Sequence, residues 1–274
     1  MKKPEICIMT GYGINCDYET ADAFRLAGGK AERVHINDLV LGVKELERYH
    51  ILGDPGGFSD GDHIKSGTVL SNRMKYKLGE QIQKFINDGK LILGICNGDQ
   101  MLQRYGLIPA AGGSYGVQTT SLMFNDSGKF ECRWVHIKNV SGGKCIFAKN
   151  IEEMYIPVAH GEGKFVVDSE ETLQRLYDDN LIVFKYVDSE GNPANGRYPE
   201  NPNGSVDDIA AISDPFGLIL GMMPHPERIC RLITHPQYQR IKRECRERGI
   251  PVPEEGDGLK IFRNAVDYAR KNLI

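Results

Sequence analysis

The sequence of 274 residues lacks the features that mark several specialised classes of protein. Its net charge is only −3, from 34 lysine and arginine against 37 aspartate and glutamate residues, so charge gives no reason to expect a nucleic acid or an anionic membrane as a partner. No apolar run approaches the roughly 18 residues that suggest a membrane span. The short apolar run near the N-terminus is too brief for the core of a signal peptide. We therefore expect a chain of the cytoplasm.

The cysteines show no pairing pattern. There are seven of them, an odd number, and the sequence contains no Cys-x-x-Cys pair and no Cys/His spacing typical of a metal site. This usage fits a reducing compartment, where each thiol is either a small buried hydrophobe or a reactive group. The sequence thus predicts neither a disulfide framework nor a metal site.

The first hundred residues alternate between strand and helix patterns. Continuous apolar runs between helices favour a parallel sheet that helices cover on both faces. We expect strands at 5–10, 33–36, 50–53 and 90–95, and helices at 17–26, at 74–87 and directly after residue 95.

The second half has a different texture. Residues 130–137 alternate apolar and polar side chains, 181–187 form another strand, and 208–223 form a strand pair around an Asp-Pro-Phe-Gly turn. The predicted fold is α/β, a mainly parallel sheet flanked by helices with an antiparallel β appendage. We expect one domain over 1–274, closed by a helix at 259–272, with 229–257 inserted before that helix.

The most specific pattern is Gly94-Ile-Cys-Asn-Gly98, placed where a strand becomes a helix. It is the cysteine form of the nucleophile elbow, whose sharp turn demands small residues two positions either side of the nucleophile. The helix N-terminus beneath the thiol favours the thiolate, and the N–H of Asn97 can stabilise an oxyanion. We therefore predict that Cys96 is a nucleophile.

A cysteine nucleophile needs a base, and the base needs an orienting group. Of the two His-Pro dipeptides, only the one at His225 is followed by a carboxylate, Glu227. In an extended segment these two side chains point to the same side, so Glu227 can hold one imidazole nitrogen while the other faces Cys96. The predicted triad is Cys96, His225 and Glu227.

A glycine pair follows the third strand in Asp54-Pro-Gly-Gly-Phe-Ser59. Glycines at a strand end let backbone N–H groups turn toward a ligand. Beside the elbow, this loop is the natural source of a second oxyanion donor.

Five ordered motifs carry a resemblance to a known family. The sequence is similar to the class I glutamine amidotransferases, and among them to the glutaminase subunits of phosphoribosylformylglycinamidine synthases. The motifs are Pro55-Gly-Gly-Phe-Ser-Asp-Gly-Asp62, Gly94-Ile-Cys-Asn-Gly-Asp-Gln100, Ala159-His-Gly-Glu-Gly163, Asn201-Pro-Asn-Gly-Ser205 and Met222-Met-Pro-His-Pro-Glu-Arg228, and Gly11-Tyr-Gly-Ile-Asn-Cys-Asp17 precedes them. The resemblance covers most of the chain.

The resemblance implies a flavodoxin-like fold and a glutaminase reaction. Cys96 would attack the side-chain amide of glutamine, form a γ-glutamyl thioester and release ammonia. Gln100 would help to hold the glutamine, and the backbone at Gly57 and Asn97 would form the oxyanion hole.

The ammonia would serve an ATP-dependent conversion of formylglycinamide ribonucleotide to formylglycinamidine ribonucleotide in purine biosynthesis. The sequence contains no Gly-x-x-x-x-Gly-Lys-Ser/Thr motif for binding ATP. The resemblance therefore implies that ATP and magnesium bind to a large synthetase subunit, which a small bridging subunit joins to this chain.

Several alternatives stay open at this point. A different acceptor, a non-enzymatic module on the same fold, and an α/β hydrolase or protease are each compatible with the elbow alone. His160 and Glu162 form a rival dyad, which we interpret as structure beside the glutamine or at an interface. Asp99 departs from the family's usual apolar, aromatic or cysteine residue. The basic stretch 238–248 is a solvated helix face or a subunit contact, with RNA binding third because one short charged helix is a weak electrostatic footprint.

Overall fold

Five parallel strands form one half of the main sheet. The computed structural model describes residues 2–62 and 64–274. The strand order in this half is β2-β1-β3-β4-β11, and every neighbouring pair is parallel. The strands are β1 (Glu5–Thr10), β2 (Lys30–His35), β3 (Ile51–Asp54), β4 (Leu91–Ile95) and β11 (Ile219–Met222). The three central strands β3, β4 and β11 are buried along their whole length.

Antiparallel strands continue the same sheet. The order runs on from β11 through β10, β9, β6 and β7, which makes nine strands among the described residues. These strands are β6 (Glu131–Asn139), β7 (Glu153–His160), β9 (Ile182–Val187) and β10 (Ile209–Ser213), while β5 (Thr120–Met123) and β8 (Lys164–Val167) form a separate antiparallel pair. The predicted α/β fold class is confirmed.

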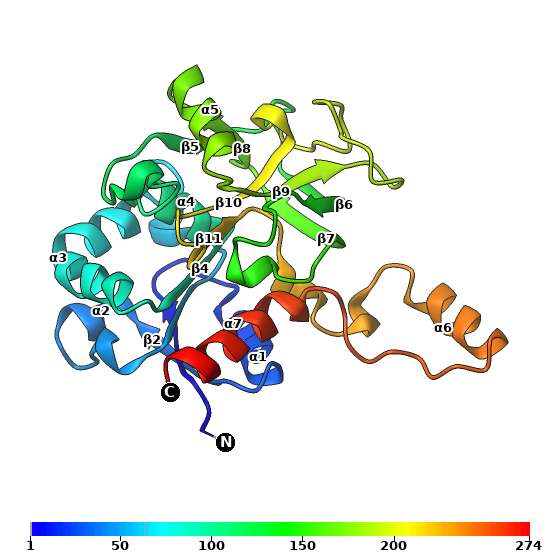
Figure 1. Cartoon of the computed structure of the whole chain (residues 1–274), viewed down its shortest axis with the longest axis horizontal. Coiled ribbons are helices and arrows are strands. Elements are labelled where there is room, and N and C mark those ends of the chain that lie inside the picture. Colours follow the sequence, from blue (N-terminus) through cyan, green and yellow to red (C-terminus); the bar gives the residue numbers. More distant parts are fainter. Residues whose placement is uncertain (1, 63) are drawn as a thin grey trace.

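The helices cover the parallel half from both sides. The helix α1 packs against α7, and α3 packs against α4; the two pairs lie on opposite sides of β4 and β11 (Figure 1). The helices are α1 (Asp17–Leu26), α2 (Ile36–Val40), α3 (Thr68–Asn87), α4 (Asn97–Tyr105), α5 (Glu170–Asp178), α6 (Tyr238–Glu247) and α7 (Leu259–Asn272). This arrangement leaves the carboxyl ends of β3, β4 and β11 along one edge, where α/β sheets place their functional groups.

Some elements differ from the sequence-based expectations. Residue 36 begins α2 instead of ending a strand, and α3 begins six residues before the expected Met74, where Leu70 and Ser71 are buried. The strand β7 was not predicted from the sequence. It contains Pro157, and a proline argues against a central strand. The structure places β7 at the edge of the sheet, where a residue without an N–H group is tolerated.

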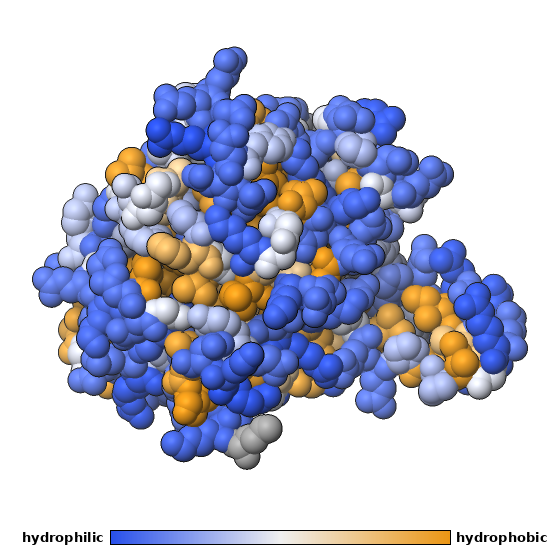
Figure 2. Space-filling view, in the orientation of Figure 1, coloured by the Kyte–Doolittle hydropathy of each residue, from blue (hydrophilic) through white to orange (hydrophobic). Residues whose placement is uncertain are grey.

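A long excursion precedes the closing helix. Residues 230–257 leave the body, form α6 and return, and Figure 1 shows this arm projecting from the rest of the molecule. Its two ends pair, since the N–H of Leu232 donates to the carbonyl of Glu254 at 2.9 Å. Apolar residues are exposed on it, including Ile233 and Ile250, and Figure 2 shows apolar atoms among the hydrophilic ones there. Among the helices of the described residues, none is both long and apolar enough to cross a membrane.

Candidate active site

Cys96 lies at the junction between β4 and α4. Its backbone has φ 52° and ψ −104°, a conformation that is strained for a residue other than glycine and typical of a nucleophile elbow. The N–H of Cys96 donates to the carbonyl of Met222 at 2.8 Å, which ties the elbow to the end of β11. The thiol thus lies over the N-terminus of α4, where the helix dipole favours negative charge.

At Gly94 and Gly98, the two glycines of the elbow, neighbouring atoms leave no room for a side chain. A Cβ atom on Gly98 would lie 1.9 Å from the carbonyl oxygen of Asp54, and one on Gly94 would lie 2.8 Å from the carbonyl oxygen of Gly98. No side chain fits at either position without moving the backbone. The small residues that the elbow motif demands are therefore explained by the close packing of β3, β4 and α4.

His225 and Glu227 form a buried pair. Nδ1 of the imidazole lies 2.6 Å from Oε1 of the carboxylate, and both side chains are almost completely buried. The N–H of His225 donates to the carbonyl of Pro157 at 2.8 Å, which fixes the histidine backbone against β7. The expected extended segment is wrong, because Pro226–Ile229 forms a short 3₁₀ helix. That turn, rather than an extended strand, brings the carboxylate to the ring.

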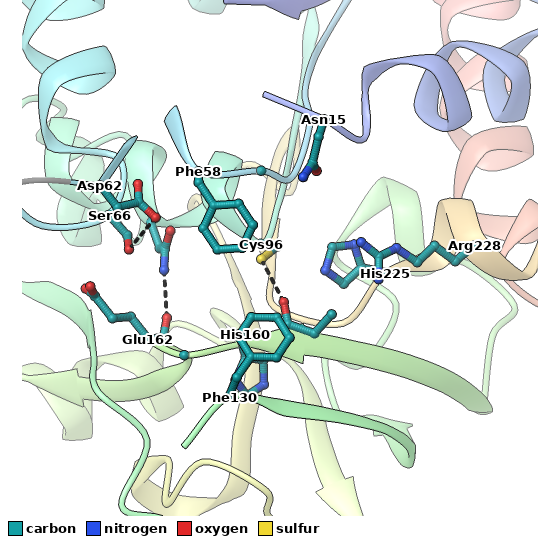
Figure 3. A pocket seen from close by; sticks show the side chains of 14 residues that line it. Asn15, Phe58, Asp62, Ser66, Cys96, Phe130, His160, Glu162, His225 and Arg228 are labelled. Atoms are coloured by element: carbon teal, nitrogen blue, oxygen red, sulfur yellow. Dashed lines mark hydrogen bonds between the residues drawn. The ribbon is translucent and has the colours of Figure 1, made fainter. Parts of the chain in front are cut away.

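The environment of His225 favours the imidazolium form. Burial alone lowers the pKa of His225, but the nearby Glu227 carboxylate and Cys96 sulfur outweigh it, so the pKa lies well above its ordinary value. Nε2 is buried and has no hydrogen-bond partner among the described residues. The ring is thus held at one nitrogen by a carboxylate, and Figure 3 shows it beside the Cys96 thiol.

A cavity opens over the Cys96 thiol (Figure 3). Four of the predicted site residues line this cavity, namely Gly57, Cys96, Gln100 and His225. The other two lie beside it: Glu227 is behind the imidazole, and the Asn97 side chain contacts Gln100. The other lining residues are Asn15, Phe58, Asp62, Ser66, Phe130, Ala159, His160, Gly161, Glu162 and Arg228. The structure therefore brings the predicted residues of three separate motifs to one place.

Two backbone N–H groups beside the cavity are unengaged. Within the described residues, neither Gly57 nor Asn97 donates its backbone N–H in a hydrogen bond. Gly57 has φ 153°, and a Cβ there would lie 2.7 Å from the carbonyl oxygen of Gly13, so only glycine fits. The Asn97 side chain accepts from the N–H of Ser59 at 3.4 Å, which joins the glycine loop to the elbow. Unengaged N–H groups of this kind suit an oxyanion hole.

Both ends of the Gln100 amide are used within the chain. Its Oε1 accepts from Nδ2 of Asn97 at 2.9 Å, and its Nε2 donates to the carbonyl of Glu162 at 2.7 Å. The side chain therefore connects α4 to the loop 161–163 on the opposite wall of the cavity. Its direct effect is to position that loop.

The structure separates His160 from Glu162. Nδ1 of His160 contacts Oδ1 of Asn125 at 3.0 Å, and its Nε2 lies 3.5 Å from Nδ2 of Asn203. Burial, together with the charge of the neighbouring His225, lowers the pKa of His160 to about 4. A neutral imidazole held by two amides supports the wall of the cavity, while its neighbour Ala159 presents a carbonyl 3.7 Å from the Cys96 sulfur.

Several lining residues were not proposed as site residues from the sequence, among them Asp62 and Phe130. Asp62 accepts from the Ser66 hydroxyl at 3.0 Å and from Nδ2 of Asn97 at 3.3 Å, and burial raises the pKa of Asp62. It ends the Phe-Ser-Asp-Gly-Asp motif, which was the available signal for it. Phe130 stands opposite Phe58, with ring centroids 6.4 Å apart (Figure 3). No local pattern in the sequence indicates this position, because only the tertiary fold brings Phe130 to the cavity.

Two further carboxyl groups lie buried beneath the elbow. Asp99 accepts from Nε2 of Gln103 at 2.9 Å, and burial raises the pKa of Asp99 to about 7. Its side chain fills the space above Gly221 of β11. Burial also raises the pKa of Asp54 well above its ordinary value, and neither of its oxygens has a hydrogen-bond partner among the described residues. The unusual Asp99 is thus a packing residue between α4 and β11.

Comparisons with known proteins identify the family. Residues 3–269 match the model of the CobB/CobQ-like glutamine amidotransferase domain. The phosphoribosylformylglycinamidine synthase subunit PurQ of Methanococcus maripaludis is 48% identical over 269 residues, 98% of this chain and 98% of that protein. PurQ of Dehalococcoides mccartyi is 44% identical over 271 residues, 99% of this chain and 100% of that one. The chain belongs to the PurQ family of glutamine amidotransferases.

A solved structure agrees with this membership. A chain in the structure of PurLQS from Thermotoga maritima matches with a TM-score of 0.69 and 28% identity, over 97% of this chain and 99% of that one. The family predicted from five motifs is confirmed, and the chain is an enzyme, a glutamine amidotransferase. These matches cover almost the whole length of this chain and of each relative.

Proposed function

We propose that this chain is the glutaminase subunit of phosphoribosylformylglycinamidine synthase and that Cys96, His225 and Glu227 are its catalytic triad. The observation that carries the proposal is the cavity that Cys96 and His225 share, with Glu227 bonded to the far side of the imidazole. A strained elbow, a buried base and an orienting carboxylate are the three parts that nucleophilic catalysis requires.

The reaction begins at the Cys96 sulfur. The thiolate attacks the side-chain amide carbon of glutamine, and the thiol proton, held on His225, passes to the departing nitrogen as ammonia leaves. A γ-glutamyl thioester remains on Cys96. His225 then removes a proton from water, which attacks the thioester carbonyl and releases glutamate and the free thiol. Each step moves one proton through the same imidazole nitrogen.

Glu227 and the backbone N–H groups stabilise charge during these steps. Glu227 keeps Nδ1 of His225 protonated, so that the other nitrogen faces the reacting atoms. The tetrahedral intermediate bears an oxyanion, and the N–H groups of Gly57 and Asn97 are the donors we assign to it. Each such donor is worth about 3 kcal/mol in related acyl transfers.

The cavity also suits the charged end of glutamine. Asp62 and Glu162 line it opposite His225 (Figure 3), and a carboxylate is the natural partner of the α-ammonium group. Gln100 positions the loop that bears Glu162 through its 2.7 Å bond to the backbone. We therefore assign substrate binding to Gln100, Asp62 and Glu162.

The second half of the overall reaction belongs to a partner. We assign ATP and magnesium to a large synthetase subunit, with a small bridging subunit joining the two, and we place the reaction in the cytoplasm. The relative from Thermotoga maritima was solved as PurLQS, which supports this assembly. The ammonia would react there with an ATP-activated formylglycinamide ribonucleotide.

The predicted insertion 229–257, which is the arm 230–257 together with Ile229, is best explained as an insertion in a single domain. Its paired ends at Arg231 and Glu255 permit replacement of the residues between them by a short glycine-serine turn. We expect the shortened chain to keep its melting temperature and its basal glutaminase rate. Loss of the folded state would show that the arm is part of the domain.

A glutaminase assay tests the proposed function. Purified chain, alone and with its synthetase subunits, is incubated with glutamine, and glutamate and ammonia are measured. We expect Cys96→Ala to reduce the rate by about three orders of magnitude or more, while Cys132→Ala, at an exposed thiol, retains it. When the partners, ATP, magnesium and formylglycinamide ribonucleotide are also present, formylglycinamidine ribonucleotide should form. Normal turnover in Cys96→Ala would remove Cys96 from the mechanism.

A further inference from the structure

A second thiol lies beside the catalytic imidazole. Cys16 directly precedes α1 and is almost completely buried. Its sulfur, a ring nitrogen of His225 and a carboxylate oxygen of Glu227 all lie within 4.8 Å of one another. Gly56 closes the remaining side, because a Cβ there would lie 3.4 Å from the Cys16 sulfur and 2.9 Å from Cε1 of His225.

Arg228 connects this thiol to the triad. Its Nη2 donates to the Cys16 sulfur at 3.2 Å, and its Nε lies 3.8 Å from Oε1 of Glu227. The same Oε1 atom holds Nδ1 of His225 at 2.6 Å. Two cationic groups, the guanidinium and the imidazolium, therefore lie beside the same buried carboxylate, whose other oxygen, Oε2, has no hydrogen-bond partner among the described residues. In this structure the imidazole has the short contact with Oε1, and the guanidinium donates to the sulfur instead.

The same three donors would also suit a soft divalent cation, since cysteine, histidine and glutamate are common zinc ligands. The guanidinium makes that arrangement unfavourable. It is bonded to the sulfur and carries positive charge at the edge of the cluster, where it would repel a second cation. A metal ion would also have to break the short contact between His225 and Glu227. The cluster is better matched to holding Arg228 than to holding a metal.

We propose that Cys16 is a positioning residue for the glutaminase reaction. Its sulfur holds the Arg228 guanidinium, so that Glu227 remains hydrogen-bonded to His225. The proposal rests on the proposed function, because it concerns the orientation of the base in that reaction. Without the Cys16 sulfur, Nη2 of Arg228 loses its acceptor. The nearest negative group is then Glu227, and a charge-assisted contact to it would draw the carboxylate away from the ring.

The removal of Cys16 should therefore change how His225 titrates. A carboxylate shared with Arg228 stabilises the imidazolium less, so the pKa of His225 falls toward its ordinary value. In the pH profile of kcat/KM, the limb at high pH, where the imidazolium loses its proton, moves to lower pH. A merely structural role for Cys16 would lower the amount of folded enzyme without moving that limb.

A double-mutant cycle in the reconstituted complex tests the proposal. The variants are Cys16→Ala, Cys16→Ser, Arg228→Gln and Cys16→Ala/Arg228→Gln. We expect Cys16→Ala to lower kcat about tenfold, with a much smaller change in KM, and to move the high-pH limb down by about half a unit. Cys16→Ser should retain most of the activity, because a hydroxyl also accepts from a guanidinium. The double variant should recover at least about threefold over Cys16→Ala, because the competing cation is absent.

The outcomes separate this proposal from the proposed function. A Cys16→Ala enzyme within about twofold of the wild type, or a double variant no faster than Cys16→Ala, would overturn the positioning role. If Cys16→Ala does not fold, Cys16→Val, which keeps most of the side-chain volume but has no acceptor, and its double variant with Arg228→Gln give the same decision. The rate of Cys96 alkylation against pH supplies a second readout that needs no turnover. Failure of the proposed function appears separately, as normal activity in Cys96→Ala.

Discussion

Nδ1 of His225 lies 2.6 Å from Oε1 of Glu227, and both side chains are sealed from solvent. A buried imidazole next to a carboxylate is held in one orientation and one tautomer, with its other nitrogen left for the reacting groups. The pair sits on a short 3₁₀ helix at the end of β11, across the cavity from the loop that bears Glu162 (Figure 3). This contact explains why His225, among the histidines that the structure describes, is suited to act as a base.

Replacement of Glu227 by glutamine should separate orientation from binding. The amide keeps the size of the carboxylate but removes its charge, so the imidazolium loses its main support. We expect kcat to fall by about 10² to 10⁴ with a smaller change in KM. Steady-state glutaminase kinetics measure this, and circular dichroism checks the fold. A glutamine variant with wild-type kcat would be incompatible with the triad.

Replacement of Gly98 by alanine should unfold the elbow. The added Cβ would meet the carbonyl oxygen of Asp54 at 1.9 Å, so strand and helix must separate, and we expect a loss of about 3 kcal/mol or more in unfolding free energy. Gly79→Ala in α3 is the matched control, since its Cβ would meet nothing closer than 3.6 Å. That variant should be neutral or more stable by up to about 1 kcal/mol. Urea denaturation compares the two, and equal stabilities would contradict the packing described here.

Asp99 should make stability depend on pH. Burial raises the pKa of Asp99 to about 7 in the folded state, against an ordinary value of 3.8. The folded chain therefore binds the proton more tightly than the unfolded chain, and stability falls as pH rises from about 4 to about 7, then levels off.

Asp99→Asn removes that titration while its amide oxygen still accepts from Gln103. We expect the melting temperature of the variant to exceed that of the wild type by a margin that grows between pH 5 and pH 8. At pH 8 the gain should be at least about 1 kcal/mol. Differential scanning calorimetry across this range measures the margin. A constant margin at every pH would mean that Asp99 is ionised in the folded chain already.

Asp62→Asn should weaken glutamine binding. The proposed partner of this carboxylate is the α-ammonium group, so we expect KM to rise about tenfold or more with kcat changed much less. Glutamine analogues that lack the α-amino group should have the same KM with the variant as with the wild type. An unchanged KM would move the ammonium site to Glu162 alone.

The elbow and the central strands could be predicted because their signals are local. The run Leu91–Ile95 is buried on both faces. Gly94 is demanded by its contacts with Gly98 and Leu102, a few residues along the chain, whereas Gly98 is demanded by the tertiary contact with Asp54 of β3. The partnership of His225 with Glu227 was also predictable from their spacing. The reason given for it was wrong, because proline starts a 3₁₀ turn there instead of continuing the strand.

The walls of the cavity could not be predicted in the same way. Phe130 stands opposite Phe58, and His160 bonds to Asn125 and Asn203, which lie 35 and 43 residues away in the chain. These contacts depend on how the antiparallel strands are placed beside the parallel half. A histidine two residues from a glutamate suggested a dyad, and only the tertiary structure shows that the ring turns toward the asparagines instead.

The most direct test of the account is to capture the acyl group on Cys96. The chain in its reconstituted complex is mixed with glutamine, quenched in acid during turnover, digested and mapped by mass spectrometry. We expect a glutamyl group on the Cys96 peptide alone, absent from Cys96→Ala and more abundant when Glu227→Gln slows hydrolysis of the thioester. A complex that turns over glutamine with Cys96 unmodified at every time point, or with the glutamyl group on Cys16, would contradict it.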